Sequence, residues 1–145
     1  MTDEQFWQII EDAKAKSNGN RNAHLEEMTQ TLSALPLQQL VEFEHLFDRK
    51  RDAAYRWDIW AAAYLLNGGC SDDGFHYFRA WLISEGKEVY EATIENPDNL
   101  ATHVNQTANH RYDWELFGCA AWQVYRKRTK EEMPPDEDSP PSPDM

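Results

Sequence analysis

The sequence has few cysteines and no long apolar run, and both features exclude classes of protein. Its 145 residues contain two cysteines, Cys70 and Cys119, which form no Cys-x-x-Cys pair. This spacing predicts neither a disulfide framework nor a thiolate zinc site, so both side chains are expected to be reduced thiols. No stretch reaches the roughly 20 apolar residues of a membrane-spanning helix, and the first residues do not resemble a signal peptide. We therefore predict a cytoplasmic protein that does not bind membranes.

The acidic charge is concentrated at one end of the chain. The formal net charge is -12, and residues 131–145 hold six acidic residues, no basic residue and five of the seven prolines. Such a segment cannot form a helix and has little to bury. This predicts a helical domain over residues 1–130 and a disordered acidic Pro-rich tail over 131–145. The tail contains a PxxP pattern at Pro140–Pro143, but we favour a solubilising role over binding to an aromatic groove.

One cluster of basic residues interrupts this acidic character. It consists of Arg126, Lys127, Arg128 and Lys130 and is followed at once by acidic residues. Phosphate contacts supply most nucleic-acid affinity, so a single cluster in an acidic chain predicts no nucleic-acid binding. Cations in the last turn of a helix complement its dipole, which is the interpretation we prefer. Mimicry of nucleic acid would require the acids of the domain to lie at phosphate-like spacing.

Apolar residues recur at intervals of three and four, which predicts helices through most of the chain. The expected helices cover about residues 3–16, 22–34, 36–54, 59–66, a segment from Ser71 to Gly86, 87–95 and 111–129. Residues 102–110 are polar and are assigned no element. The chain shows no sustained alternation, no hairpin dipeptide between strands and no repeat. We predict an all-α fold, a single compact helical domain of about six or seven helices.

Aromatic residues make up 12% of the chain and are frequent in its middle. The segment Ile59–Leu66 has no charged residue and is apolar around its whole circumference, which predicts a buried helix. A short Asn67-Gly68-Gly69 loop joins it to another mostly apolar helix, so we predict a buried central aromatic helical hairpin. Trp57, Trp60 and Tyr64 have the spacing of a stacking ladder for ligands, but packing is the interpretation we favour.

Several segments of this region resemble a known family. They are Phe6-Trp7, Tyr55–Tyr64, Asn67–Phe75, Tyr77–Arg79 and Trp81–Ile83. In these residues the chain resembles domain-of-unknown-function family 4240, a mainly bacterial family, over about residues 3–101. The last predicted helix matches it loosely, and the acidic tail falls outside it. The resemblance implies no activity, cofactor or catalytic residue.

Polar residues occur in the central hairpin where its periodicity predicts packing. Asp72, His76 and Arg79 fall at i, i+4 and i+7 and therefore share one stripe of a helix. An antiparallel hairpin places Asn67 near Asp72 and brings Asp58 close to Arg79, which predicts a buried Arg79–Asp58 pair. The candidate polar site consists of Asp58, Asn67, Asp72, Asp73, His76 and Arg79.

This candidate site fits two interpretations. Asp72 and Asp73, with Asn67 and Ser71, supply oxygen ligands for magnesium or calcium, with His76 as a base, which describes a metal-assisted hydrolase. In the structural interpretation Ser71 caps the helix and the two aspartates complement its dipole. The chain contains no EF-hand, HExxH, GxSxG or P-loop sequence. We therefore favour the structural interpretation and expect no cofactor.

Cys70 is the only other candidate for chemistry, because a thiol ahead of a helix N-terminus can become a nucleophile. The neighbouring aspartates disfavour its thiolate, so we do not expect a catalytic cysteine. The predicted function is a non-catalytic interaction or accessory domain with a protein partner, and the metal-assisted hydrolase is the alternative. Binding to a partner requires an exposed apolar patch, which we expect on the helices within residues 3–54 or on the last helix.

Overall fold

Every regular element that the structure describes is a helix. The computed structural model describes residues 1–104 and 111–141, and these ranges contain eight α-helices, one 3₁₀ helix and no strand. The elements are α1 (Asp3–Ser17), α2 (Arg21–Ala34), α3 (Leu37–Ala53), α4 (Trp57–Asn67), α5 (Asp72–Ser84), α6 (Lys87–Glu95), η1 (Pro97–Asn99), α7 (Leu100–Val104) and α8 (Glu115–Thr129). The predicted all-α fold is confirmed. Of the polar segment 102–110, residues 105–110 lie outside the described residues.

Local sequence signals define the start of several helices. The backbone N–H of Gln5 donates to Thr2 Oγ1 at 3.1 Å, and the Thr2 N–H donates to Gln5 Oε1 at 2.9 Å, which completes a capping box for α1. Asn20 accepts a hydrogen bond from the N–H of Ala23 at the start of α2. These bonds satisfy N–H groups that have no partner within their helix.

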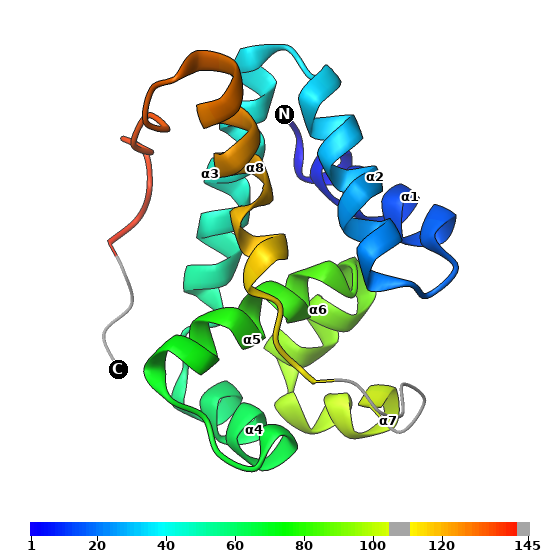
Figure 1. The fold of residues 1–145 in the computed structure, drawn as a ribbon. Coiled ribbons are helices and arrows are strands. Elements are labelled where there is room, and N and C mark those ends of the chain that lie inside the picture. The colour runs from blue at the N-terminus through cyan, green and yellow to red at the C-terminus, as the bar shows by residue number, and fades with distance from the viewer. Residues whose placement is uncertain (105–110, 142–145) are drawn as a thin grey trace.

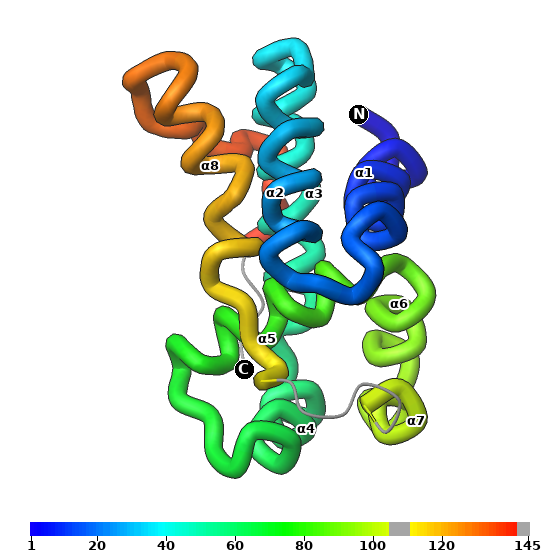
Figure 2. Tube along the Cα trace, turned by 45° about the vertical axis from the view of Figure 1, so that its right-hand side comes forward, coloured from blue at the N-terminus to red at the C-terminus, as the bar shows by residue number. Residues whose placement is uncertain are grey.

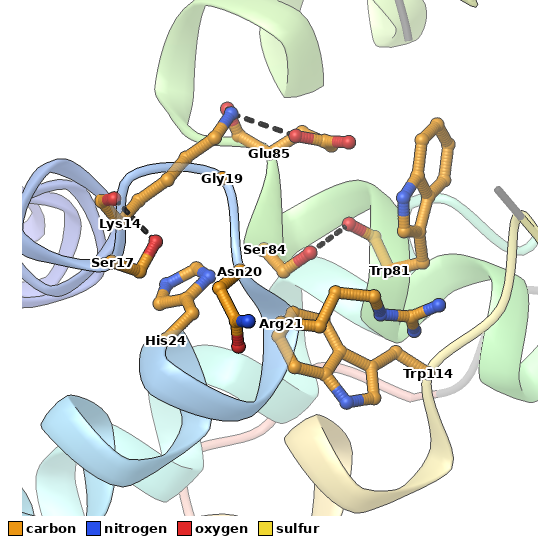
Figure 3. Close-up of a pocket in the computed structure, with 10 residues that line it drawn as sticks. All are labelled: Lys14, Ser17, Gly19, Asn20, Arg21, His24, Trp81, Ser84, Glu85 and Trp114. Atoms are coloured by element: carbon orange, nitrogen blue, oxygen red, sulfur yellow. Dashed lines mark hydrogen bonds and ion pairs between the residues drawn. The ribbon is translucent and has the colours of Figure 1, made fainter. Parts of the chain in front are cut away.

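The helices pack around α5. Figure 1 shows α3 and α8 side by side, with α1 and α2 to one side of them, and Figures 1 and 2 both show α4 at one end of the molecule. α5 packs against α1, α3, α4, α6 and α8. The turn between α1 and α2 lies beside the C-terminal end of α5, where Lys14 Nζ donates to Glu85 Oε2 at 2.7 Å (Figure 3). Helices distant in sequence are thereby held in one body.

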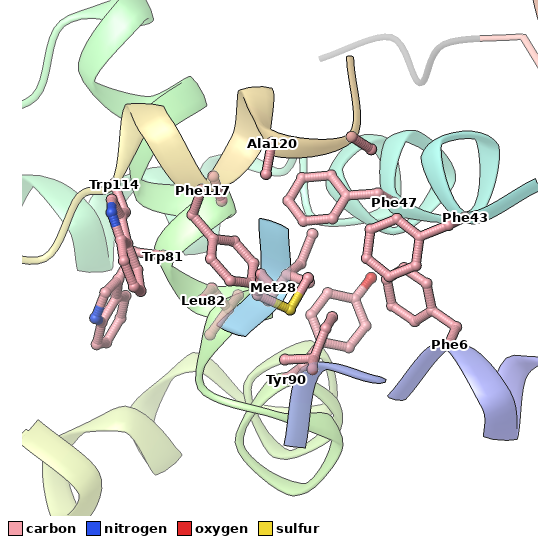
Figure 4. Packing of buried hydrophobic residues seen from close by; sticks show 14 of the residues in the cluster. Phe6, Met28, Phe43, Phe47, Trp81, Leu82, Tyr90, Trp114, Phe117 and Ala120 are labelled. Carbon is pink, nitrogen blue, oxygen red and sulfur yellow. The ribbon is translucent and has the colours of Figure 1, made fainter. Parts of the chain in front are cut away.

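The core is a cluster of aromatic side chains. The Phe6 and Phe43 ring centroids lie 4.8 Å apart, and those of Phe47 and Phe117 lie 5.9 Å apart. Figure 4 shows these rings gathered between α1, α3 and α8, with Met28 and Tyr90 beside them. Ring pairs at such separations are favourable in addition to the area they bury. The domain thus has a buried aromatic cluster, to which α5 of the predicted central hairpin contributes Phe75 and Phe78.

The expectation that residues 59–66 form a helix buried on all sides is wrong. Only Ile59 and Ala63 of α4 are buried, whereas Tyr64 and Leu65 are 58% and 81% exposed. α4 lies at the end of the molecule and packs on one side, against α5 and η1 (Figure 1). Trp60 packs as predicted, with its ring centroid 4.8 Å from that of Phe75. An apolar face of α4 therefore remains in contact with solvent.

Residues 131–141 contain no helix or strand but contact α3. Arg49 donates to Asp136 through Nε at 2.6 Å and Nη2 at 2.7 Å, and His45 Nε2 lies 2.9 Å from the carbonyl oxygen of Pro134. Residues 142–145, which include part of the PxxP pattern, lie outside the described residues. The division at residue 130 and the disorder of the tail stay predictions. Among the described helices, none has the length and apolar character required to span a membrane.

Gly86 is expected to be the glycine that tolerates substitution least. Its φ is +103°, and a Cβ placed there would lie 3.2 Å from Glu11 Oε1, which accepts a hydrogen bond from the N–H of Lys87. We expect Gly86→Ala to lower the free energy of unfolding by about 2 kcal/mol, because backbone strain and a close contact add. Gly19→Ala, with φ +81° and no atom within 4 Å, is the control and should cost about 1 kcal/mol in urea denaturation. Equal losses would exclude the contact with Glu11.

Candidate functional site

Four of the six predicted site residues line one hollow between α3 and α5. These are Asp72, Asp73, His76 and Arg79, and the hollow is completed by Asp52 and Tyr55. The three residues at i, i+4 and i+7 on α5 therefore face the same hollow. The candidate site predicted from the sequence did not include Asp52 and Tyr55. Asp52 lies on the polar face of its helix, and no spacing pattern links either residue to α5.

Arg79 is the most buried charged group of this hollow. It is 6% exposed, and its guanidinium lies 4.7 Å from the Tyr55 ring centroid and 4.6 Å from that of Phe75. It donates to the carbonyl oxygens of Arg51 at 3.0 Å and Phe75 at 3.3 Å. Two aromatic faces and two carbonyls thus stabilise a cation that has no carboxylate within 4.0 Å among the described residues.

The predicted Arg79–Asp58 pair is wrong. Asp58 pairs with Arg56, with Oδ2 at 2.7 Å from Nη2 and Oδ1 at 3.0 Å from Nε. Arg56 immediately precedes α4, so its guanidinium reaches the Asp58 carboxylate in the first turn of the helix without any contribution from α5. Both Asp58 and Arg56 lie outside the hollow.

Asn67 also lies outside the hollow. Its Nδ2 donates to the carbonyl oxygen of Tyr112 at 3.1 Å, and its Oδ1 accepts from the N–H of Tyr112 at 3.2 Å. The Asn67 amide therefore makes both hydrogen bonds with the backbone of one residue, and it joins the end of α4 to the segment before α8.

His76 is poorly suited to act as a base at neutral pH. Its Nε2 lies 2.7 Å from Nη1 of Arg51, and because a guanidinium only donates, Nε2 is the acceptor. Partial burial, followed by the positive charges of Arg51 and Arg79, lowers the pKa of His76 to about 4. The imidazole is therefore neutral at pH 7, and one of its nitrogens is occupied.

The metal-assisted interpretation gains no support from the geometry. Within residues 1–104 and 111–141, no group of three or more His, Cys, Asp or Glu side chains is arranged to hold a metal ion. Ser71 Oγ accepts from the N–H of Gly74 at 3.0 Å, and Asp72 and Asp73 occupy the first turn of α5. These are the roles of the structural interpretation. The metal-assisted hydrolase stays a prediction.

Neither cysteine has the environment of an activated nucleophile. Partial burial, reinforced by Asp113, raises the pKa of the Cys70 thiol. Partial burial and the charge of Glu115 act in the same direction on Cys119. Both are free thiols. A raised pKa lowers the thiolate fraction on which nucleophilic attack depends.

The apolar surface of α4 is the second candidate site. We define the α4 face by four exposed residues, Trp57, Ala61, Tyr64 and Leu65. They fall at i, i+4, i+7 and i+8, so they share one side of the helix. We expected an exposed apolar patch on the earlier helices or the last one. Those helices expose three large apolar residues, Leu37 of α3 and Leu116 and Trp122 of α8. Leu116 and Trp122 are six residues apart and face different directions, so they form no common patch.

The comparison with known proteins identifies a family but no function. No curated protein and no solved structure matches the chain. The model of one family, described as a protein of unknown function (DUF4240), matches residues 1–127. This match includes all but the last two residues of α8, which the resemblance in the sequence left only loosely covered. The chain belongs to the DUF4240 family, whose function is unknown.

Proposed function

We propose that this protein is a non-catalytic interaction domain that binds a basic amphipathic helix of a protein partner on the α4 face. The observation that supports this function best is the exposure of three large apolar side chains on one side of α4. Trp57 is 66% exposed, and Tyr64 and Leu65 are exposed to a similar or greater extent. Contiguous apolar surface of this kind is uncommon on monomers and marks sites of association.

The α4 face is held in a fixed position. Ile59 and Ala63 anchor the opposite side of the helix in the core, and Asn67 fixes its C-terminal end through two hydrogen bonds to the backbone of Tyr112. Trp57 stacks on Trp60, with ring centroids 5.6 Å apart. A partner that binds here therefore orders few protein groups, which lowers the entropic cost of association.

The charge around the α4 face determines the kind of partner. Asp98 on the neighbouring η1 and Glu95 at the end of α6 are exposed, whereas Asp58 of α4 is exposed but paired with Arg56. The whole chain carries a formal charge of -12, so a second copy is repelled. A helix with apolar anchors between lysine or arginine residues complements both the apolar face and its acidic surroundings. The free thiols of Cys70 and Cys119 support a reducing compartment, so we place this interaction in the cytoplasm.

A synthetic amphipathic helix of leucine and lysine tests the proposal. We expect it to bind the full chain, and we expect Leu65→Lys to weaken binding at least tenfold, because the substitution removes an anchor and adds repulsion. Leu65 is 81% exposed, so the free energy of unfolding should change by less than about 0.5 kcal/mol. The measurements are isothermal titration calorimetry and urea denaturation.

The matched control is Leu116→Lys on α8. Leu116 is 54% exposed and lies outside the α4 face, so this variant adds the same charge and should bind the peptide like the unmodified protein. Equal weakening in both variants would mean that charge alone drives binding and would contradict the proposal. A dimer in light scattering that Leu65→Lys dissociates would assign the α4 face to self-association instead.

A further inference from the structure

A second cavity lies on the other side of α5, away from the hollow and the α4 face. It is open to solvent on one side and is lined by the turn between α1 and α2, the C-terminal end of α5 and the segment before α8 (Figure 3). Two indoles, those of Trp81 and Trp114, form part of its wall, and both residues are buried. A concave, mainly apolar lining with a few polar groups is typical of small-molecule sites.

Positive charge exceeds negative charge in this cavity. Lys14 and Arg21 line it together with a single carboxylate, that of Glu85. Lys14 Nζ is paired with that carboxylate at 2.7 Å. The Arg21 guanidinium has no carboxylate within 4.0 Å among the described residues, and lies 4.4 Å from the Trp114 ring centroid. The charges of Asp113 and Glu85 act on Arg21, but its guanidinium forms no direct ion pair with either carboxylate.

Several hydrogen-bond donors of this cavity have no acceptor among the described residues. Arg21 Nη1 and Nη2 donate hydrogen bonds to the carbonyl oxygens of Arg111 and Asp113. A guanidinium has five N–H groups, so some of them remain available to a ligand. The indole N–H of Trp81, which faces the other lining side chains in Figure 3, donates to no acceptor in residues 1–104 and 111–141. An anion with two acceptor oxygens matches these donors, and a guanidinium binds a carboxylate with two parallel bonds.

The size of the cavity limits the ligand. Its volume is about 150 Å³. An apolar cavity of about this volume holds a six-membered ring such as benzene. His24 closes the site from the side of α2, with its ring centroid 5.4 Å from that of Trp114. His24, Trp81 and Trp114 are buried, so this part of the wall is formed before a ligand binds. We infer that this cavity binds a small aromatic carboxylate, with the ring beside the indoles and the carboxylate on Arg21.

Benzoate is the probe for this inference, with the full chain as the protein. Because Trp81 and Trp114 line the site, benzoate should change tryptophan fluorescence in a saturable way. Benzamide, which has nearly the same shape without the charge, should bind at least tenfold more weakly. Arg21→Gln should weaken benzoate binding at least tenfold. The matched control is Arg126→Gln, since Arg126 lies 5.4 Å from the Trp122 ring centroid outside the cavity.

Three results would overturn the inference. These are no saturable response to benzoate, equal affinity for benzamide, and undiminished binding in Arg21→Gln. The comparison of benzoate with benzamide uses only the unmodified protein, so it decides the question even if Arg21→Gln does not fold. Leu65→Lys should bind benzoate normally, which separates this site from the proposed partner surface on α4.

Discussion

Glu44→Gln is expected to raise the free energy of unfolding by about 3 kcal/mol at pH 7 and by almost nothing at pH 4. Glu44 is 7% exposed in α3. Burial, and then the negative charge of Asp48, raises its pKa to about 8, although Arg51 opposes this shift. The folded protein therefore holds a proton on Glu44 that the unfolded chain releases above pH 4.5.

The sign of the pH dependence follows from this difference. Because the folded state binds the proton more tightly, the free energy of unfolding falls as the pH rises from 4.5 towards 8. Glutamine has the same shape and no proton to lose, so the variant should lack this decline. Urea denaturation from pH 4 to pH 9 measures it, with Glu26→Gln on the exposed side of α2 as control. Parallel pH profiles for Glu44→Gln and the unmodified protein would contradict the prediction.

Glu44 also shows what the sequence pattern contains and what is easily overlooked. Leu40, Phe43 and Phe47 define the buried stripe of α3, as predicted. Glu44 and Arg51 lie four residues after Leu40 and Phe47, so they share that stripe and are buried. Charged residues at apolar positions of a helical repeat were therefore a usable signal in α3, as they were in α5.

Other features depend on packing that no local pattern contains. An apolar circumference predicts what α4 can bury, but whether its faces are covered depends on how many helices surround it. α4 lies at the end of the molecule, so Tyr64 and Leu65 remain exposed. Likewise, Asp58 was matched to Arg79 by hairpin geometry, whereas Arg56 reaches it over two residues. Short-range partners compete effectively with pairs that require a fixed crossing of two helices.

The cavity that we infer to bind benzoate illustrates the same limit, because its residues come from distant parts of the sequence. Its charged residues Lys14, Arg21 and Glu85 come from three segments, and Trp114 comes from a fourth. None of these segments has a motif that indicates binding. Sequence periodicity places residues on one face of one helix, and so it identifies the stripe on α5. It cannot identify a site that exists only after α1, α2, α5 and α8 have packed.

Glu85→Gln is expected to have the opposite effect to Glu44→Gln and to lower the free energy of unfolding by about 3 kcal/mol at pH 7. Glu85 Oε2 lies 2.7 Å from Lys14 Nζ, and its Oε1 lies 3.5 Å from His103 Nε2. Burial favours a neutral carboxyl, but interactions with His103 and Lys14 outweigh it and lower the pKa of Glu85 to about 2. The ionised form therefore stabilises the fold.

This stabilisation is fully present above pH 4.5 and is lost as the pH falls towards 2, because the unfolded chain then takes up the proton first. The difference between Glu85→Gln and the unmodified protein should shrink from about 3 kcal/mol at pH 7 to about 1 kcal/mol at pH 3 in urea denaturation. Glu88→Gln, an exposed residue of the neighbouring α6, is the control and should show little difference at either pH.

The alternative outcomes of this experiment have different meanings. A loss of equal size at both pH values would mean that the glutamine disturbs packing. A loss confined to neutral pH would show that two glutamates, the buried Glu44 and the half-buried Glu85, have opposite effects on stability. Glu44 is tolerated at a cost because it lacks an adequate cation, and Glu85 joins α1 to α5 because two bases face it.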